Sequence, residues 1–312
     1  MKKLSEKVSF LRSIQEMSLE DSREHLSSDL QDIFGKLQNF SGHSDDNLED
    51  LANKILKDIN TFDQKFNIYK DTVLDTIAEQ EKTYFQKSYS LYEDMKNDSD
   101  EWILSRSNTL TVDNSNDYLA HVESYTSWKY PALYIRPGLD DYVKKMTACD
   151  PLYIVDHTHG LLEPSKSLWS DQYQTRVRYK TISDDLDEIF KDFPKNQLGL
   201  IVATNFFNFK PLEVIQKYIL EFNDLLRPGG VVVFTYNNCD LPGPVRNVEN
   251  AFNTYTPGRL LQRIIEGYGF EVIYSNQSPN GYNWFEFRKP GNYKSLRGGQ
   301  ALAQIKDSRL DN

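Results

Sequence analysis

Proline is missing from the first 130 residues: all 12 prolines lie at or after Pro131, and only Gly35 and Gly42 of the 15 glycines come before it. Proline removes a backbone donor and glycine loosens the backbone, so a stretch almost free of both is compatible with long helices. We therefore expect an all-helical N-terminal part, followed by a part of different architecture.

Cysteine and long apolar runs are also scarce. The two cysteines, Cys149 and Cys239, are too few for a disulfide framework or a zinc site, and we expect free thiols in a reducing compartment. No apolar run approaches the roughly 18 residues that span a bilayer. The start, MKKLSEKVSF, lacks the apolar region of a signal peptide. The sequence predicts a soluble protein of the cytoplasm, or of an assembly built there, without a membrane partner.

Positive charge is in deficit as well, since the formal net charge is -10. A nucleic-acid-binding face needs clustered lysine and arginine, so nucleic acid is not the expected partner. A local basic patch near the C-terminus stays open as an alternative; its residues are Arg288, Lys289, Lys294 and Arg297.

The N-terminal part does contain a long helical pattern. Its apolar residues are spaced by threes and fours and fall on one helical stripe. They are Leu48, Leu51, Ile55, Ile59, Phe62, Phe66, Tyr69, Val73 and Ile77. Ser44 or Asp45 can cap this helix, the pattern fades near 97–98, and the helix would be about 75 Å long. A shorter helix before the break at Gly42 is indicated by Leu26, Leu30, Ile33, Leu37 and Phe40.

Such a stripe needs a partner, and two alternatives stay open. The segment around Trp102 can fold back to complete a small bundle, or another chain can cover the stripe in a coiled coil or docking contact. The N-terminal helices would then serve self-association or bind a protein partner. We assign residues 1–104 to this arm and the polar residues 105–117 to a linker.

From residue 118 to residue 290 short apolar runs alternate with helical ones, which is typical of a parallel sheet with crossover helices. The expected strands are 131–135, 152–155, 176–182, 198–204, 231–236, 271–275 and 284–288. The expected helices are 139–146, 163–172, 184–190, 212–226 and 257–267, the last capped by Thr256. A 15-residue segment, 240–254, is expected to insert between a strand and a helix, and residues 291–312 form a flexible tail.

Three stretches of this part resemble one family. A helix followed by LLRPGG and VVVFTY is similar to class I S-adenosylmethionine-dependent methyltransferases where the fourth helix enters the fifth strand. TPGRLLQRIIEGYGFEVI resembles their next helix and sixth strand, and ALYIRPG with LYIVD resembles their first strand-helix-strand unit. The resemblance implies a Rossmann-like, doubly wound α/β fold and S-adenosylmethionine as the cofactor.

The resemblance also implies cofactor-binding positions. Tyr134 stands where the family usually has an acid, and Arg136 stands where it usually has a glycine, so Gly138 is left as the glycine of the first loop. Asp156 ends the second strand 18 residues after Gly138, close to the ~20-residue spacing at which an acid accepts hydrogen bonds from a ribose diol. Asp184 follows the third strand, where the family often places an acid against the adenine.

Two further groups complete the candidate site. His157 and His159 follow Asp156, and a histidine at this position suits the role of a general base. A metal site is not expected, because the sequence offers no third ligand at a suitable spacing. Asn205 opens the segment 205–209, which faintly resembles the Asn-Pro-Pro-Tyr of amino-group methyltransferases without its prolines. Asn205, Asn208 and residues 236–238 are the candidates for orienting a methyl acceptor.

Two functions follow from these residues. One is an active methyltransferase with an unknown acceptor; the other is a methyltransferase fold without activity, serving as a structural subunit of a large assembly such as a virus particle. The scarcity of glycine in the first loop favours the inactive structural subunit, whereas Asp156 favours the active methyltransferase. A nicotinamide-linked dehydrogenase is excluded because no G-x-G-x-x-G follows the first strand.

Overall fold

The computed structural model describes residues 28, 29, 31–33, 35, 48–98, 100–108, 115–136, 141–250, 252–278 and 283–291. The chain divides into two compact units, Met1–Thr83 and Tyr84–Asn312. The second unit therefore takes in residues ahead of 118, the start expected for the α/β domain.

The first unit contains most of a long helix, α3 (Leu48–Asn97), whose end at Asn97 agrees with the fading of the apolar pattern. Residues 28, 29, 31–33 and 35 are also helical. They pack on α3 through an Asp29–Lys65 ion pair, and Ile33 and Ile55 are both buried. The other apolar residues of the predicted shorter helix and the predicted caps, Ser44 and Asp45, lie outside the described residues. Several large side chains of α3 stay exposed, namely Leu56, Ile59, Phe66, Leu74 and Ile77.

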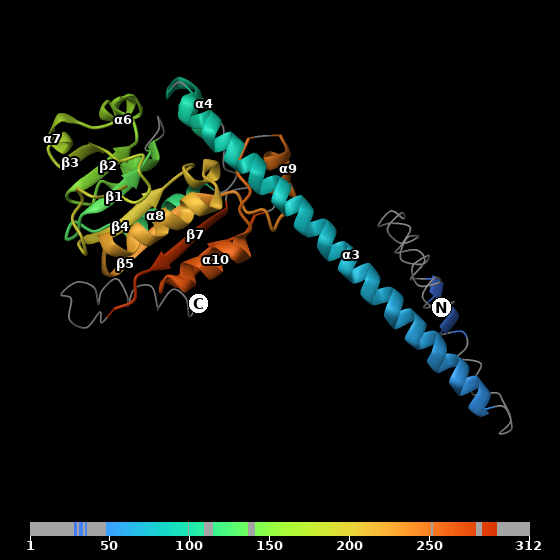
Figure 1. The fold of residues 1–312 in the computed structure, drawn as a ribbon. Helices are drawn as coiled ribbons and strands as arrows, with labels where there is room; N and C mark the ends of the chain where they lie inside the picture. The colour runs from blue at the N-terminus through green and yellow to red at the C-terminus, as the bar shows by residue number, and fades with distance from the viewer. Residues whose placement is uncertain are drawn as a thin grey trace. The chain divides into compact units, whose positions relative to one another are not determined.

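The second unit is built on a seven-stranded sheet with the order β3-β2-β1-β4-β5-β7-β6 (Figure 1). The strands are β1 (Ala132–Ile135), β2 (Leu152–Asp156), β3 (Val177–Thr181), β4 (Leu198–Ala203), β5 (Leu226–Tyr236), β6 (Glu271–Asn276) and β7 (Asn283–Arg288). The first five are parallel, and β7 runs antiparallel to both β5 and β6. Apolar runs of the sequence form the central parallel strands β1, β2, β4 and β5, because parallel strands are covered on both faces.

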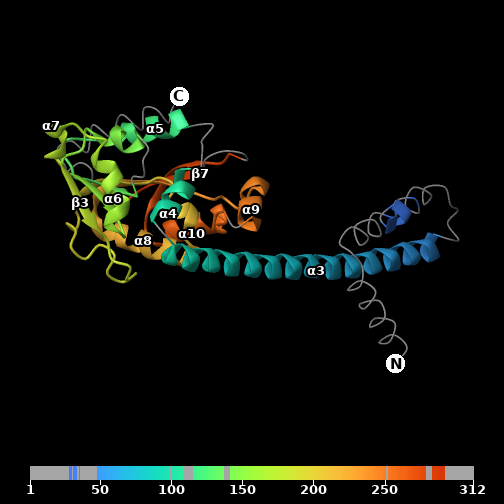
Figure 2. The ribbon, with the colours of Figure 1, turned by 90° about the horizontal axis from the view of Figure 1, so that it is seen from above.

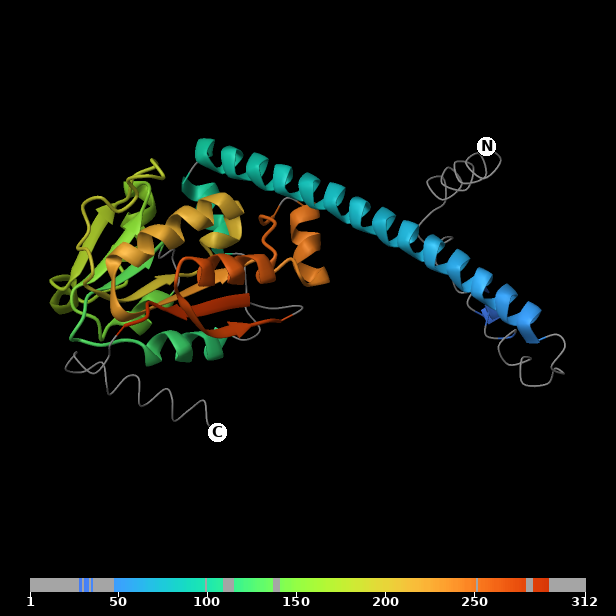
Figure 3. The same cartoon turned by 60° about the horizontal axis from the view of Figure 1, so that its bottom comes forward.

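Successive residues of the central strands point to opposite faces of the sheet. One face carries Leu133 and Ile135 and packs against α8 (Leu212–Leu225) and α10 (Gly258–Gly267). The other face carries Ala132 and Tyr134 and packs against α5 (Ser115–Ser124) and the 3-10 helix η2 (Asp141–Met146). Figures 2 and 3 show α5 and α8 on opposite sides of the sheet.

The expected helix at 184–190 is wrong, because residues 182–197 cross from β3 to β4 as turns. Leu186, Ile189 and Phe190 have helical spacing, but they pack against the core from a loop that the Ser183 N–H closes by donating to the Ile189 carbonyl (3.4 Å). The expected helix at 163–172 is also displaced, since α6 (His159–Lys166) and α7 (Asp171–Gln174) replace it. The remaining short helices are α4 (Asp100–Asn108), η3 (Phe207–Phe209) and α9 (Pro242–Glu249).

The linker expected at 105–117 is partly helical, since α4 covers its start and α5 its end. Trp102 and Ile103 of α4 pack back on Leu91 and Met95 of α3, which lie beyond the apolar stripe of residues 48–77 that either alternative was to cover. Within the described residues, no helix is long and apolar enough to cross a membrane.

Candidate functional site

The candidate site lies at the carboxyl edge of β1, β2 and β4. Arg136 follows β1, Asp156 is the last residue of β2, and Asn205 comes two residues after β4. In a doubly wound sheet this edge, where the strand order reverses, is where ligands bind. The pairing of Ile135 with Val155 sets Arg136 beside Asp156.

Arg136 and Asp156 form a buried, two-pronged ion pair. The Arg136 Nε donates to Asp156 Oδ2 at 2.9 Å, and its Nη2 donates to Oδ1 at 3.1 Å. The two side chains are 4% and 0% exposed. Asp156 Oδ1 also accepts from the His157 backbone N–H at 2.7 Å. Both carboxylate oxygens are therefore occupied by donors of the protein itself.

The backbone of Arg136 is in the left-handed region, with φ of 51°. That conformation suits glycine and strains a residue with a β-carbon. Asn205, at the end of the neighbouring β4, shares it with φ of 54°. Strained residues of this kind persist where the surrounding contacts fix them, and here the ion pair with Asp156 fixes Arg136.

Aromatic rings hold a second buried cation at this edge. The Phe206 ring centre lies 5.0 Å from the Arg136 guanidinium carbon and 5.0 Å from the Lys210 Nζ. Lys210 Nζ also lies 4.7 Å from the Tyr92 ring centre. Burial, with the Arg136 charge second, lowers the pKa of Lys210 to about 7. Nothing in the sequence singles out Lys210, because a lysine after an aromatic run is ordinarily solvent-exposed.

His157 is poorly suited to act as a base. Its Nε2 lies 2.7 Å from the Tyr218 hydroxyl, and its Nδ1 lies 2.9 Å from a carboxylate oxygen of Asp184. Burial, and then the charges of Lys210 and Arg136, lower the pKa of His157 to about 2. A general base needs a pKa near the working pH, so the geometry does not favour this role.

Of the other predicted cofactor positions, Tyr134 points away from this group and Asp184 joins it. Tyr134 is buried among the residues that face α5, and its hydroxyl donates to Thr204 Oγ1 at 2.8 Å. The Asp184 side chain is 81% exposed and meets His157. Gly138 lies outside the described residues. Of the predicted cofactor residues, the structure gathers Arg136, Asp156, His157, Asp184 and Asn205 at one edge.

The asparagines expected to orient an acceptor are bonded within the protein. Asn208 Oδ1 accepts from Thr235 Oγ1 at 3.0 Å, and the same hydroxyl oxygen accepts from the Asn205 backbone N–H at 2.7 Å. Asn237 Nδ2 donates to the carbonyls of Pro244 and Thr254, both at 3.0 Å. These contacts fasten the loop after β4 to strand β5 and close the segment after β5 on itself.

The last turns of α3, residues 84–97, also belong to this edge (Figure 3). Tyr84 donates to Glu249 Oε1 at 3.0 Å, and Ser88 Oγ accepts from the Tyr255 backbone N–H at 2.6 Å. Tyr92 and Phe85 pack against the hydrophobic core on the α8 and α10 side of the sheet. Helix α3 thus contacts the inserted segment 240–254 and its neighbours, and the loop after β4.

A metal site finds no support in this region. His159 is exposed and lies 2.9 Å from Glu163, whereas His157 points inward to Tyr218. Among the described residues, no group of three histidine, cysteine or acidic side chains is placed to hold a metal ion.

No protein-family model matches this sequence, and no curated protein matches it either. Solved structures with a similar fold include the complex between the Haloferax volcanii Trm112 methyltransferase activator and a putative methyltransferase (9% identity, 57% of this chain and 89% of that chain, TM-score 0.48). Another is the N-methyltransferase NodS from Bradyrhizobium japonicum with S-adenosyl-L-homocysteine (15% identity, 66% of this chain and 100% of that chain, TM-score 0.46).

Because these identities are so low, the fold assignment rests on the strand order. The order 3-2-1-4-5 is that of the doubly wound nucleotide-binding sheets. An antiparallel strand, β7, is inserted between β5 and β6. The second unit has a Rossmann-like sheet of the class I methyltransferase type.

Proposed function

We propose that this chain is a non-catalytic protein with a methyltransferase fold, which does not bind S-adenosylmethionine and which serves as a structural or docking subunit. The observation that carries the proposal is the Arg136–Asp156 pair, because a ribose diol would need the carboxylate oxygens that the guanidinium already occupies.

Electrostatics supports the same conclusion. The cofactor carries a sulfonium cation, and the described residues of this edge already include the buried guanidinium of Arg136 and the buried amino group of Lys210, whose positive form is disfavoured there, beside the buried carboxylate of Asp156. A further positive charge in surroundings of low dielectric is unfavourable. The residues present therefore do not fit the cofactor.

The loops that would contact a methyl acceptor also support the proposal of a non-catalytic protein. Asn208 and Asn237 use their side chains to hold neighbouring loops, and Phe206, Phe207 and Phe209 are fully buried rather than presented to a substrate. Side chains committed to internal bonds are not available to orient an incoming nucleophile.

Titration calorimetry of the full-length protein with S-adenosylhomocysteine and S-adenosylmethionine tests the proposal. We expect no binding heat at millimolar ligand. Binding that Asp156→Asn abolishes and that Asp171→Asn, a change of an exposed acid on α7, leaves intact would overturn the proposal in favour of a cofactor-binding methyltransferase.

The helical part suggests how the subunit makes contacts. Residues 48–83 of α3 carry exposed Phe66, Leu74 and Ile77, and apolar side chains on a helix surface at this spacing favour helix pairing. We propose that this segment self-associates.

Sedimentation velocity of the full-length chain checks the self-association. We expect an oligomer that Phe66→Glu with Ile77→Glu converts to a monomer, whereas Glu79→Lys, at an exposed position on the opposite face of the helix, does not. A monomeric wild-type chain at high concentration would reject self-association and leave a different protein as the partner of the arm.

A further inference from the structure

Strand β3 forms one end of the sheet, and among the described residues β2 is its one paired neighbour. The Arg176 carbonyl accepts from the Leu152 N–H at 3.1 Å, and the Ile182 N–H donates to the Asp156 carbonyl at 2.9 Å. In a parallel ladder the residues that bond to one neighbour alternate with those that face the other side. The backbone N–H and C=O groups of Tyr179 and Thr181 therefore face away from β2, along the outer edge.

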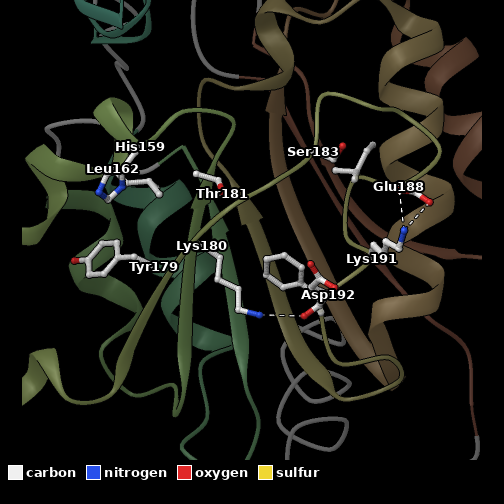
Figure 4. Close-up of a pocket in the computed structure, with 11 residues that line it drawn as sticks. His159, Leu162, Tyr179, Lys180, Thr181, Ser183, Glu188, Lys191 and Asp192 are labelled. Carbon is white, nitrogen blue, oxygen red and sulfur yellow. Dashed lines mark hydrogen bonds and ion pairs between the residues drawn. The ribbon is translucent and has the colours of Figure 1, made fainter.

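A pocket of about 660 Å³ follows this edge (Figure 4). Its lining residues are His159, Leu162, Tyr179, Lys180, Thr181, Ser183, Glu188, Ile189, Lys191, Asp192 and Phe193. Tyr179 and Thr181 lie toward α6, and Lys180 lies toward Asp192 on the other side (Figure 4). Since side chains from both faces of β3 line the pocket, it runs along the edge of the strand.

The walls of the pocket come from α6 and from the turns at 188–193. Among the described residues, no backbone hydrogen bond from these walls reaches Tyr179 or Thr181. The outer edge thus has the unpaired donors and acceptors to which an extended segment can add as a further strand.

Basic side chains occupy one face of the strand at this edge, while the charges of the pocket lining balance, with Lys180 and Lys191 against Glu188 and Asp192. Arg176, Arg178 and Lys180 alternate along the strand and share one face. Arg176 pairs with Asp150 at 3.1 Å. Arg178 instead donates to the carbonyls of Thr175 (2.6 Å) and Val177 (3.1 Å), and Lys180 donates to the Asp192 carbonyl (3.0 Å). Within the part of the chain that the structure describes, neither Arg178 nor Lys180 has a carboxylate partner.

We propose that the outer edge of β3 binds an acidic, extended segment of a partner protein as an eighth strand of the sheet. Acidic side chains on the added strand would lie across from Arg178 and Lys180, where opposite charges stabilise a strand pair. A second copy of β3 is a poor occupant, because it would place arginine and lysine against arginine and lysine.

Fluorescence anisotropy of the full-length protein with a labelled short peptide that alternates glutamate and valine tests the proposal. We expect saturable binding that weakens as salt is added. A matched peptide that alternates lysine and valine should not bind. Absence of binding by the acidic peptide would overturn the proposal and leave the charges as a device that only discourages strand addition.

Thr181→Pro separates strand pairing from simple charge attraction. The proline removes the outward N–H of residue 181 and leaves the bonds of Lys180 and Ile182 to β2 in place. We expect about tenfold weaker binding of the acidic peptide, which corresponds to roughly 1.4 kcal/mol. Thr181→Val keeps the N–H and should bind like the wild type. Equal binding by Thr181→Pro would exclude strand addition.

Charge reversal and amide exchange complete the test. Arg178→Glu with Lys180→Glu should bind the lysine peptide in place of the glutamate peptide. In the wild-type protein, the peptide should slow hydrogen exchange at the Tyr179 and Thr181 amides, whereas the Lys180 amide is protected already. This measurement needs no variant, so unfolding of Thr181→Pro would not remove the test; unchanged exchange would contradict the proposal.

Discussion

Lys210, which follows η3, places its ammonium group 4.7 Å from the centre of the Tyr92 ring on α3. A helix that begins in the first unit thereby contributes one side of a buried cation site in the second. The Phe206 ring contributes the other contact at 5.0 Å. Rings can stabilise a buried cation, but they do not replace its hydration fully, so the charged form of Lys210 is disfavoured.

The pH dependence of stability should report this lysine. Its pKa is about 7 in the folded protein and 10.5 ordinarily, so the unfolded chain binds more protons between these values. Stability from this group therefore rises with pH from about 7 to about 10, by up to roughly 1.4 kcal/mol per pH unit. Urea unfolding below pH 9.0, above which the raised pKa values of the buried Cys149 and Cys239 thiols act in the opposite direction, should show the rise for wild type and for an exposed-site control, Lys87→Met, but not for Lys210→Met. If the stability of Lys210→Met rose with pH as steeply as that of the wild type, the lowered pKa of Lys210 would be contradicted.

The Arg136–Asp156 pair should behave as a unit in stability measurements. Arg136→Met leaves Asp156 as a buried charge without its ionic partner and should cost about 3–5 kcal/mol. Arg136→Met combined with Asp156→Leu removes both charges and should regain most of that loss. Chemical denaturation of the single and double variants gives the coupling energy; additive losses would show that the two residues act independently.

The start of α10 offers a test between two possible caps. Thr256 is the cap expected from the sequence, but the structure uses Asn238, whose Oδ1 accepts from the Gly258 N–H at 3.2 Å. Asn238→Ala should lower stability by about 1–2 kcal/mol. Thr256→Val, similar in shape, should change it by less than about 0.5 kcal/mol. Thermal unfolding compares them, and the reverse order would favour the sequence-based cap.

Two glycines of α10 should respond oppositely to alanine. A β-carbon on Gly258 would lie 2.5 Å from Asn238 Oδ1 and 2.8 Å from the Tyr236 hydroxyl oxygen, whereas one on Gly267 meets nothing within 4 Å. Gly258→Ala should destabilise the protein by about 1–3 kcal/mol. Gly267→Ala should stabilise it by up to about 1 kcal/mol, because alanine loses less backbone freedom on folding. The unfolding free energies of the two variants, each compared with that of the wild type, test both expectations.

Local pattern was enough for the elements whose signal is continuous along the chain. The apolar runs LYIVD and LGLIVAT predict strands that the structure has as β2 and β4, because strands covered on both faces need apolar residues throughout. The amphipathic stretch at 212–226 predicts α8, and the loss of the apolar stripe predicts the end of α3 at Asn97. The same reasoning failed at 184–190, where apolar residues with helical spacing pack from turns.

The sequence by itself determined the order of the seven strands and, with the family resemblance, the fold class, since spacing and apolar content act over a few residues. Only the tertiary structure decided what the carboxyl edge can do. Strand register placed Arg136 against Asp156, packing of α3 enclosed Lys210, and the turns after β3 left its outer edge open. Such contacts join residues far apart in the chain, and their energies depend on distance and burial that no local pattern encodes.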